Sequence, residues 1–234
     1  MLVKDDIPPL IRSRARQFRV ISTRYPPVNF FERLVPDEAM EALWALESQT
    51  NTRLQDEAGD IRLVAPKDRV SGPGASIVMA AFTHIGHASR FTDGSYGVYY
   101  AARSQETAMR ETVHHREIIA RDAHLDVGEF EMRVWIGQIK KPLHDIRAAN
   151  YDYLHDEAPR PEDHPQAQAF ARQLRKKGSW GLYYRSVRHR EGECIAALRP
   201  PAISLPVPGE LLVYVWNGEK ITYVYSKSEP LLTF

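Results

Sequence analysis

The alternation of apolar and polar positions predicts a chain of short strands and amphipathic helices. The clearest strand lies between Phe130 and Ile136, where every second residue is apolar, as expected when one face of a strand is buried. Shorter apolar runs predict further strands at 18–21, 97–101, 182–184, 194–198, 211–216 and 221–225. The last two flank Asn217-Gly218, a pair that predicts a hairpin with a type I′ turn.

Apolar residues with helical spacing predict helices over 36–48, 77–85, 105–121 and 166–177. Ser104 precedes the third helix as an N-cap, and Gly178 follows the fourth as a stop. Residues 155–165 hold three prolines and four acids, so an exposed connection is expected there. Together these elements predict an α+β fold, β-rich toward the C-terminus. We expect one mixed domain over 1–234, with a helical insertion at 36–85 and a terminal hairpin at 206–234.

The charge balance excludes one class of function. The 234 residues contain 31 Lys+Arg against 30 Asp+Glu, a formal net charge of +1. A protein that binds bulk nucleic acid usually carries a marked basic excess that neutralises phosphates, so direct nucleic-acid binding is not expected. With 43% hydrophobic and 26% charged residues, the composition is that of a globular chain.

Several kinds of site are also excluded. The single cysteine, Cys194, has no partner for an internal disulfide. The sequence has nine histidines but no HExxH motif, no histidine pair at i,i+4 and no cysteine cluster, so no metal site is expected. No G-x-S-x-G motif marks a serine hydrolase, and no stretch approaches the roughly 18 apolar residues of a membrane span. We expect a cytoplasmic protein without membrane contact.

Candidate chemistry gathers in residues 87–117. Arg90 precedes a turn, and Tyr100 ends a predicted strand. Glu111 and His115 lie four residues apart on the predicted helix, so their side chains share one face. Two interpretations of this pair stay open: a solvated helix face, or a histidine that orients a carboxylate.

Residues 178–188 form a second candidate segment, which combines glycines, aromatic residues, two serines and two arginines. Aromatic rings stack on bases, arginines bind phosphates in a bidentate manner, and a serine hydroxyl holds a ribose or an amide. The segment is therefore either part of a nucleotide site or a strand whose aromatic residues lie in the core.

Residues 89–102, 106–108 and 110–112 resemble the RES-domain toxins, the toxin halves of bacterial RES–Xre toxin–antitoxin pairs. The resemblance covers about 16–205 and is strongest at 89–117 and 178–200. Residues that match the family's motifs are Arg19, Arg90, Tyr100, Glu111 and Ser186. The sequence departs from the family in two places: a long segment separates Arg19 from Arg90, and Ser89-Arg90-Phe91 replaces the usual Gly-Arg-Trp-like motif.

The resemblance implies a fold similar to ADP-ribosyltransferase toxins and an activity that degrades NAD by cleaving the nicotinamide–ribose bond. NAD is then the substrate, and inorganic phosphate a possible co-substrate. The expected catalytic residues are Arg90, Glu111 and Ser186. The expected substrate-binding residues are Arg19, Arg90, Tyr100, His115 and Ser186. Breaking an N-glycosidic bond develops oxocarbenium character on the ribose, which the Glu111 carboxylate would stabilise.

The expected roles of the other residues follow the same resemblance. Arg90 and Arg19 would hold the pyrophosphate or an incoming phosphate, and Tyr100 would stack on the nicotinamide ribose. Ser186 would hydrogen-bond the nicotinamide end, and His115 would lie behind these groups or on the acceptor side.

Three functions remain open. The leading one is a toxin that cleaves NAD by phosphorolysis or hydrolysis. The second is a mono-ADP-ribosyltransferase that modifies a protein, and the third is an inactive binding module of the same fold. The resemblance implies an Xre-type antitoxin as partner, which would supply any DNA binding, and a toxin homodimer within the complex.

Overall fold

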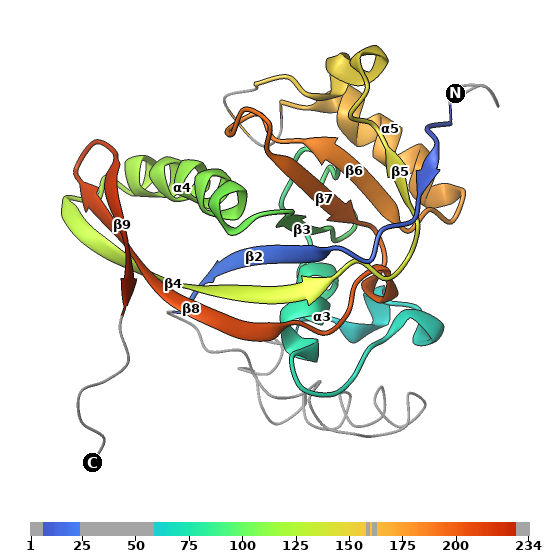
Figure 1. Cartoon of the computed structure of the whole chain (residues 1–234), viewed down its shortest axis with the longest axis horizontal. Coiled ribbons are helices and arrows are strands. Elements are labelled where there is room, and N and C mark those ends of the chain that lie inside the picture. Colours follow the sequence, from blue (N-terminus) through green and yellow to red (C-terminus); the bar gives the residue numbers. More distant parts are fainter. Residues whose placement is uncertain (1–6, 24–58, 158–159, 161–162, 228–234) are drawn as a thin grey trace.

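The computed structural model describes residues 7–23, 59–157, 160 and 163–227 (Figure 1). The helix predicted at 36–48 therefore lies outside the described residues, and the predicted insertion at 36–85 is described only from residue 59 onward.

Among the described residues, nine strands form one sheet in the order β1-β5-β6-β7-β3-β2-β4-β8-β9. The strands are β1 (Leu10–Ile11), β2 (Arg16–Ser22), β3 (Tyr99–Ala102), β4 (Val127–Gln138), β5 (Leu143–Asp145), β6 (Gly181–Arg185), β7 (Glu193–Ala197), β8 (Val207–Asn217) and β9 (Ile221–Lys227). Neighbouring strands are antiparallel except β5 and β6, which are parallel. The fold mixes helices with a strand-rich sheet and is β-rich toward the C-terminus, as predicted.

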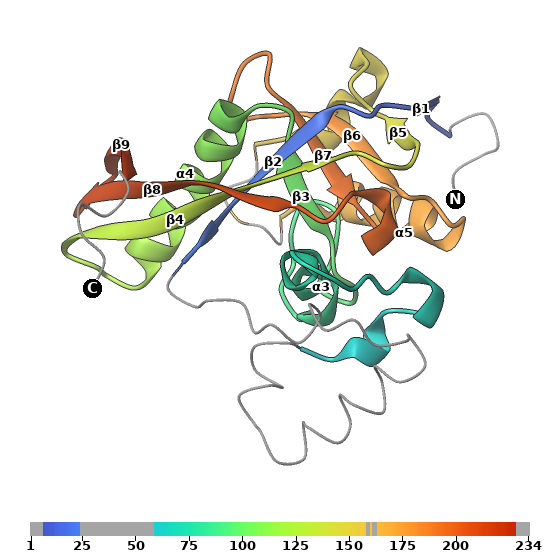
Figure 2. The ribbon, with the colours of Figure 1, turned by 60° about the horizontal axis from the view of Figure 1, so that its bottom comes forward.

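Helices cover both faces of this sheet (Figure 2). The helices α4 (Gln105–Asp122) and α5 (Pro165–Lys176) pack on one face, and α3 (Ala75–Thr83) packs on the other. The first face buries a core that includes Val20, Ala108, Met132, Phe170 and Tyr214. The second buries a core that includes Val78, Met79, Phe82, Tyr99 and Ile195. None of the described helices combines the length and the apolarity needed to cross a membrane.

The contact between α3 and the segment leading into β3 is unusually close. A Cβ atom on Gly97 would lie 2.1 Å from the carbonyl oxygen of Ala81 and 2.4 Å from Cα of Phe82. Since no side chain fits at those distances, glycine lets the two backbones touch. This close approach sets how far the segment leading into β3 lies from α3, on the face of the sheet that carries the second core.

The pairing of β2 divides the sheet. One edge of β2 pairs with β4 along its whole length, from Arg16 opposite Gln138 to Ser22 opposite Met132. Its other edge pairs with β3 at a single described position, Phe18 opposite Ala102. Beyond that position the two strands diverge, which leaves a split in the middle of the sheet.

Most predicted elements are confirmed, with small shifts of their ends. The strands β1 and β5 are not predicted, because two or three residues carry no readable alternation. Residues Ala149–Leu154 form a short 3-10 helix. The connection at 155–165 is predicted to be exposed, but His164 within it is buried, with 6% exposure. The likeness to the ADP-ribosyltransferase fold stays a prediction.

The hairpin at Asn217-Gly218 is confirmed, but its predicted turn type is wrong. A type I′ turn needs positive φ at both central residues, whereas here Gly218 has φ 95° and Asn217 is not among the positive-φ residues. Three residues, 218–220, connect β8 to β9. The Asn217 side chain accepts the backbone N–H groups of Glu219 at 3.0 Å and Lys220 at 2.8 Å, and these bonds favour the longer loop.

Candidate active site

A cavity of about 250 Å³ opens at the split between β2 and β3, beneath α4. Its walls come from β2, β3, α4, the turn before β3, and the connection from β6 to β7. The polar residues that line it include Arg19, Ser89, Arg90, Tyr100, Glu111, His114, His115, His164, Arg188 and Cys194. Five of the predicted site residues therefore face one space: Arg19, Arg90, Tyr100, Glu111 and His115.

The helix α4 presents the carboxylate of the site. Ser104 caps it by accepting the backbone N–H of Thr107 at 3.1 Å, and Glu106 lies in its first turn. Both features stabilise the positive end of a helix. The helical period then places Glu111 and His115 on the side that faces the cavity.

The carboxylate of Glu111 is held by Ser186. The Ser186 hydroxyl donates to Oε1 of Glu111 at 2.5 Å. Its oxygen also accepts the backbone N–H groups of Arg188 at 3.1 Å and His189 at 3.0 Å. A serine hydroxyl has one proton and two lone pairs, so these three contacts use all of its hydrogen-bonding capacity. The predicted bond from Ser186 to the nicotinamide end stays a prediction, and Ser186 is not in the cavity lining.

A buried thiol also lies near the same carboxylate oxygen. The Sγ atom of Cys194 is 3.9 Å from Oε1 of Glu111. Burial, reinforced by the charge of Glu111, raises the pKa of the Cys194 thiol well above its usual value. Burial likewise raises the pKa of the neighbouring Tyr184 well above its usual value. Both groups are therefore neutral at pH 7, and Cys194 is not an activated nucleophile.

Arg90 faces the cavity but is largely occupied by protein contacts. Its Nη1 donates to the carbonyl oxygen of Leu154 at 2.9 Å and to the carboxylate of Asp156 at 3.2 Å. Its Nη2 donates to the carbonyl oxygen of Asp156 at 2.9 Å. The guanidinium thus fastens residues 154–156 to the rim of the cavity, and only 12% of the side chain is exposed.

Tyr100 fastens the turn that carries Arg90. Its hydroxyl lies 2.7 Å from Oγ of Ser89 and accepts the backbone N–H of Phe91 at 3.0 Å. Burial raises the pKa of Tyr100 to about 12, so the hydroxyl keeps its proton. The predicted stacking of Tyr100 on the nicotinamide ribose stays a prediction.

Arg19 is a half-buried residue whose guanidinium has an unused donor. Its Nη1 donates to the carbonyl oxygen of Tyr100 at 3.2 Å, and its guanidinium lies 4.4 Å from the centre of the Tyr99 ring. Its Nε is buried and has no hydrogen-bond partner among the described residues. An unsatisfied buried donor is costly, so an anionic or polar ligand in the cavity would satisfy it.

Arg188 and the histidines give the cleft its electrostatic character. The charge of Arg188 is only loosely balanced, by an exposed Glu157 carboxylate at 3.6 Å. Desolvation and then the charge of Arg188 lower the pKa of His114 to about 4. Desolvation lowers the pKa of His115, against the opposing effect of Glu111. Neutral histidines and positive arginines therefore surround Glu111 at pH 7, and Glu111 is the one carboxylate among the described residues that line the cavity.

Sequence reasoning did not assign Cys194, His114 or His164 to the site. It did place Arg188 in a possible nucleotide site, as one of the two arginines of the second candidate segment. The cavity lining includes Arg188 but not the other arginine, Arg185. Cys194 joins the site because β7 runs beside β3, which no local pattern predicts. Within the described part of the chain, no group of three or more His, Cys, Asp or Glu side chains is arranged to hold a metal ion.

Fold and site together define a mixed α/β protein in which a braced carboxylate and several arginines face one cavity. The chain belongs to the RES domain family, whose model matches residues 67–217. That match includes Arg90, Tyr100, Glu111 and Ser186, whereas Arg19 lies before it.

Proteins similar to the chain include one relative in sequence and one solved structure. The uncharacterized protein y4oC of Sinorhizobium fredii is 28% identical over 217 residues, which cover 89% of this chain and 86% of that protein. The crystal structure of the M. tuberculosis MbcT-MbcA toxin-antitoxin complex contains a chain that superposes with a TM-score of 0.44 at 10% identity. That superposition covers 94% of this chain and 87% of the other.

Proposed function

We propose that the chain is the toxin component of a toxin–antitoxin pair and degrades NAD by cleaving the bond between nicotinamide and ribose. Membership of the RES domain family supports the toxin role. The observation that carries the proposal is the Glu111 carboxylate, which faces the cavity among Arg19, Arg90 and Arg188 and is held by Ser186.

The chemistry needs a fixed negative charge beside the ribose. When the bond between C1′ and the pyridinium nitrogen breaks, its electron pair goes to the nitrogen and nicotinamide leaves as a neutral molecule. The ribose carbon becomes electron-poor and takes on oxocarbenium character. A carboxylate held in place before the reaction stabilises that charge, which is the role we propose for Glu111. Because nicotinamide leaves neutral, no general acid is required, and neutral His114 and His115 fit this requirement.

The second half of the reaction needs an oxygen nucleophile. Water forms ADP-ribose and releases a proton to solvent, and inorganic phosphate forms ADP-ribose-1″-phosphate. The arginines support binding of these anions: the buried Nε of Arg19 lacks a partner among the described residues, and Arg188 is only loosely paired. Guanidinium groups bind phosphates in a bidentate manner, so we assign the pyrophosphate chiefly to Arg19 and Arg188. Arg90 adds positive charge and braces the rim.

The test is a timed assay of purified protein with NAD, in which mass spectrometry follows nicotinamide, ADP-ribose and ADP-ribose-1″-phosphate. We expect nicotinamide release that falls at least about 100-fold in Glu111→Gln, as when a transition-state stabiliser is removed. The control is Glu129→Gln, since Glu129 is exposed on β4 and is not in the cavity lining. Intact NAD after prolonged incubation of the wild type would refute the proposal.

The acceptor and the partner are tested separately. Product formed with and without phosphate distinguishes phosphorolysis from hydrolysis, and stable label from biotinylated NAD on protein would indicate a mono-ADP-ribosyltransferase. We further propose an Xre-type antitoxin as partner, a toxin homodimer within the complex, and action in the cytoplasm. Expression in bacteria tests the toxin role: we expect growth arrest that is relieved by Glu111→Gln or by a co-expressed antitoxin. If the wild type and the Glu111→Gln variant are equally harmless, the result would favour an inactive binding module.

A further inference from the structure

His164 is a buried histidine of the cavity wall that the reaction described above does not use. It lies directly before α5, and its carbonyl oxygen accepts the backbone N–H of Gln168 at 2.9 Å. The start of the helix therefore fixes the backbone that carries this imidazole.

The carboxylate of Asp156 determines which ring nitrogen of His164 carries the proton. Nδ1 of His164 lies 3.0 Å from Oδ1 of Asp156. An ionised carboxylate only accepts hydrogen bonds, so Nδ1 is the donor. In the neutral ring, the other nitrogen, Nε2, then has a lone pair that can accept a proton.

The surroundings of His164 keep its ring neutral. Desolvation and then the charge of Arg90 lower the pKa of His164. The carboxylates of Asp156 and Asp163 oppose this shift without reversing it. Because the usual pKa of histidine is about 6.5, the ring is neutral at pH 7 and Nε2 is unprotonated.

The Nε2 atom of His164 is open to a bound molecule. It forms no hydrogen bond with a described residue. Among the described residues, the only fully buried side-chain nitrogen or oxygen without a partner is Nε of Arg19, so Nε2 of His164 is not sealed inside the protein. Since His164 lines the cavity, Nε2 can contact a reactant held there.

The same carboxylate oxygen joins His164 to Arg90. Oδ1 of Asp156 accepts Nη1 of Arg90 at 3.2 Å and Nδ1 of His164 at 3.0 Å. The charge of Arg90 lowers the pKa of both His164 and His115, so its guanidinium is within electrostatic reach of α4 and of the start of α5. His164 therefore belongs to the arginine side of the cavity that also contains Glu111.

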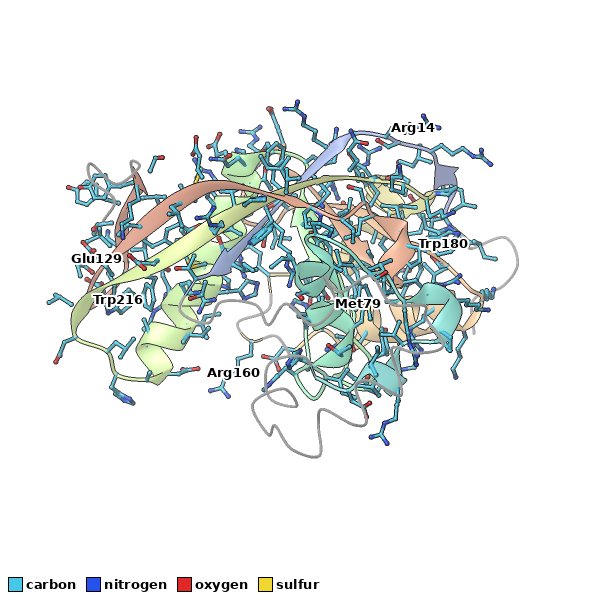
Figure 3. The ribbon with its side chains drawn as sticks, turned by 90° about the horizontal axis from the view of Figure 1, so that it is seen from below. Arg14, Met79, Glu129, Arg160, Trp180 and Trp216 are labelled. Carbon is cyan, nitrogen blue, oxygen red and sulfur yellow. The ribbon has the colours of Figure 1, made fainter. Side chains whose placement is uncertain are left out.

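The connection before α5 reaches the middle of the molecule. Arg160 of this connection also lines the cavity. Figure 3 shows Arg160 between the two ends of the molecule that Trp216 and Trp180 mark. The connection thus extends toward the region where the sheet is split.

The other two histidines of the cavity lining lack such a partner. The rings of His114 and His115 lie against each other, with their centres 5.8 Å apart. Neither ring forms a hydrogen bond with a described residue. Among the described histidines that line the cavity, only His164 has a carboxylate that fixes its tautomer.

We propose that His164 is the general base of the NAD-cleaving reaction, that water is the acceptor, and that Asp156 is a positioning residue that acts through His164. The inference rests on the proposed function. The water oxygen forms a bond to C1′ of the ribose, while the bond from C1′ to nicotinamide breaks and its electron pair goes to the pyridinium nitrogen. The water proton goes to Nε2 of His164, where Asp156 stabilises the imidazolium, and then passes to solvent. The products are ADP-ribose and neutral nicotinamide.

The test uses the whole purified chain, NAD and sodium azide, with products followed by mass spectrometry. His164→Gln should form ADP-ribose about 100-fold more slowly than the wild type, as when a general base is removed. Azide is already an anion and needs no base. It should therefore restore nicotinamide release in His164→Gln, with azido-ADP-ribose as product, and should not restore it in Glu111→Gln.

A variant of Asp156 tests the positioning role. Asp156→Asn keeps the bonds from Arg90 to the carbonyl oxygens of Leu154 and Asp156, which do not involve the side chain. It should slow ADP-ribose formation about tenfold, with little change in KM, and azide should restore the rate here as well.

The pH profile gives a readout that a purely structural role would not change. ADP-ribose formation by the wild type should decrease as the pH falls below about 6.5, because protonated His164 cannot accept a proton. With azide as acceptor this dependence should be absent. The matched control is His87→Gln, since His87 is exposed and outside the cavity lining, and it should behave as the wild type does.

The possible failures are distinguishable. If His164→Gln hydrolyses NAD at the wild-type rate, or is folded by thermal melt but not rescued by azide, His164 is not the base, while the proposed NAD cleavage stands. ADP-ribose-1″-phosphate as the main product in phosphate buffer would overturn water as the acceptor. If the wild type leaves NAD intact with and without azide, the proposed function itself fails.

Discussion

The hydroxyl of Ser186 donates to Oε1 of Glu111 at 2.5 Å while its oxygen accepts the backbone N–H groups of Arg188 and His189. One side chain thus sets both the direction of the carboxylate and the shape of the loop that carries Arg188. Since all its hydrogen-bonding capacity is used, Ser186 acts on the site as a positioning residue.

The first prediction concerns that contact. Ser186→Ala should lower kcat for nicotinamide release about 10–100-fold, because small misplacements of a catalytic group are costly. Ser186→Thr keeps a hydroxyl and should recover most of the rate. Steady-state kinetics with thermal melts of both variants measures this. Full activity in Ser186→Ala would show that Glu111 does not need the hydrogen bond from Ser186.

The second prediction distinguishes the role of Arg90 from that of Arg188, both of which line the cavity. Arg90→Ala breaks three hydrogen bonds to residues 154–156 and should lower the free energy of unfolding by about 1–3 kcal/mol. Arg188→Ala breaks only a loose pair with the exposed Glu157, so stability should stay near that of the wild type while KM for NAD rises about tenfold. Urea denaturation and initial-rate kinetics distinguish the two effects. Equal destabilisation by both variants would contradict this division of roles.

The third prediction is a pH dependence of stability. The pKa of His114 is lowered to about 4 in the folded protein, whereas an unfolded histidine titrates near 6.5. Between these values the unfolded chain binds the proton and the folded chain does not, so stability falls as pH falls from about 6.5 toward 4.

Other groups titrate over the same range, so His114→Gln is the required comparison. The variant should lose less free energy of unfolding between pH 7 and pH 5 than the wild type, as measured by urea denaturation at each pH. Identical losses in the two proteins would show that His114 does not titrate as its surroundings indicate.

The fourth prediction concerns thiol reactivity. Cys194 is 1% exposed, and burial with the nearby Glu111 charge raises the pKa of its thiol. Iodoacetamide should therefore modify the native protein far more slowly than the urea-unfolded chain, because the thiolate is the reactive form. Mass spectrometry of timed samples measures both rates, and comparable rates would show that the thiol is accessible in the folded state.

Local patterns in the sequence predict the elements but not how they meet. Alternation predicts β4, and the spacing of Ala167, Phe170, Ala171 and Leu174 predicts the buried face of α5. The strands β1 and β5 escape prediction because pairing with neighbours, rather than their own two or three residues, stabilises them. The turn after Asn217 differs from expectation because the asparagine side chain caps a longer loop.

For the candidate site too, the sequence predicts which residues take part but not how they contact one another. Arg90, Tyr100, Glu111 and His115 come from one dense stretch of sequence, so they are visible as a group. That Ser186 reaches Glu111 depends on the order β6-β7-β3-β2 in the sheet, which is set by long-range pairing. The fixed contacts of Arg90 are likewise invisible in sequence, since Leu154 and Asp156 are distant along the chain.

The single pairing of Phe18 with Ala102 makes the middle of the sheet a seam between two sets of strands. Residues from β2 line one side of the cavity, and Tyr100 and Tyr184 line the other. A molecule bound there touches both sets at once, so part of its binding free energy stabilises the folded chain by mass action. The ligand thus bridges the two sets of strands where the described sheet has its fewest paired positions, and its binding should raise the resistance of the protein to thermal and mechanical unfolding.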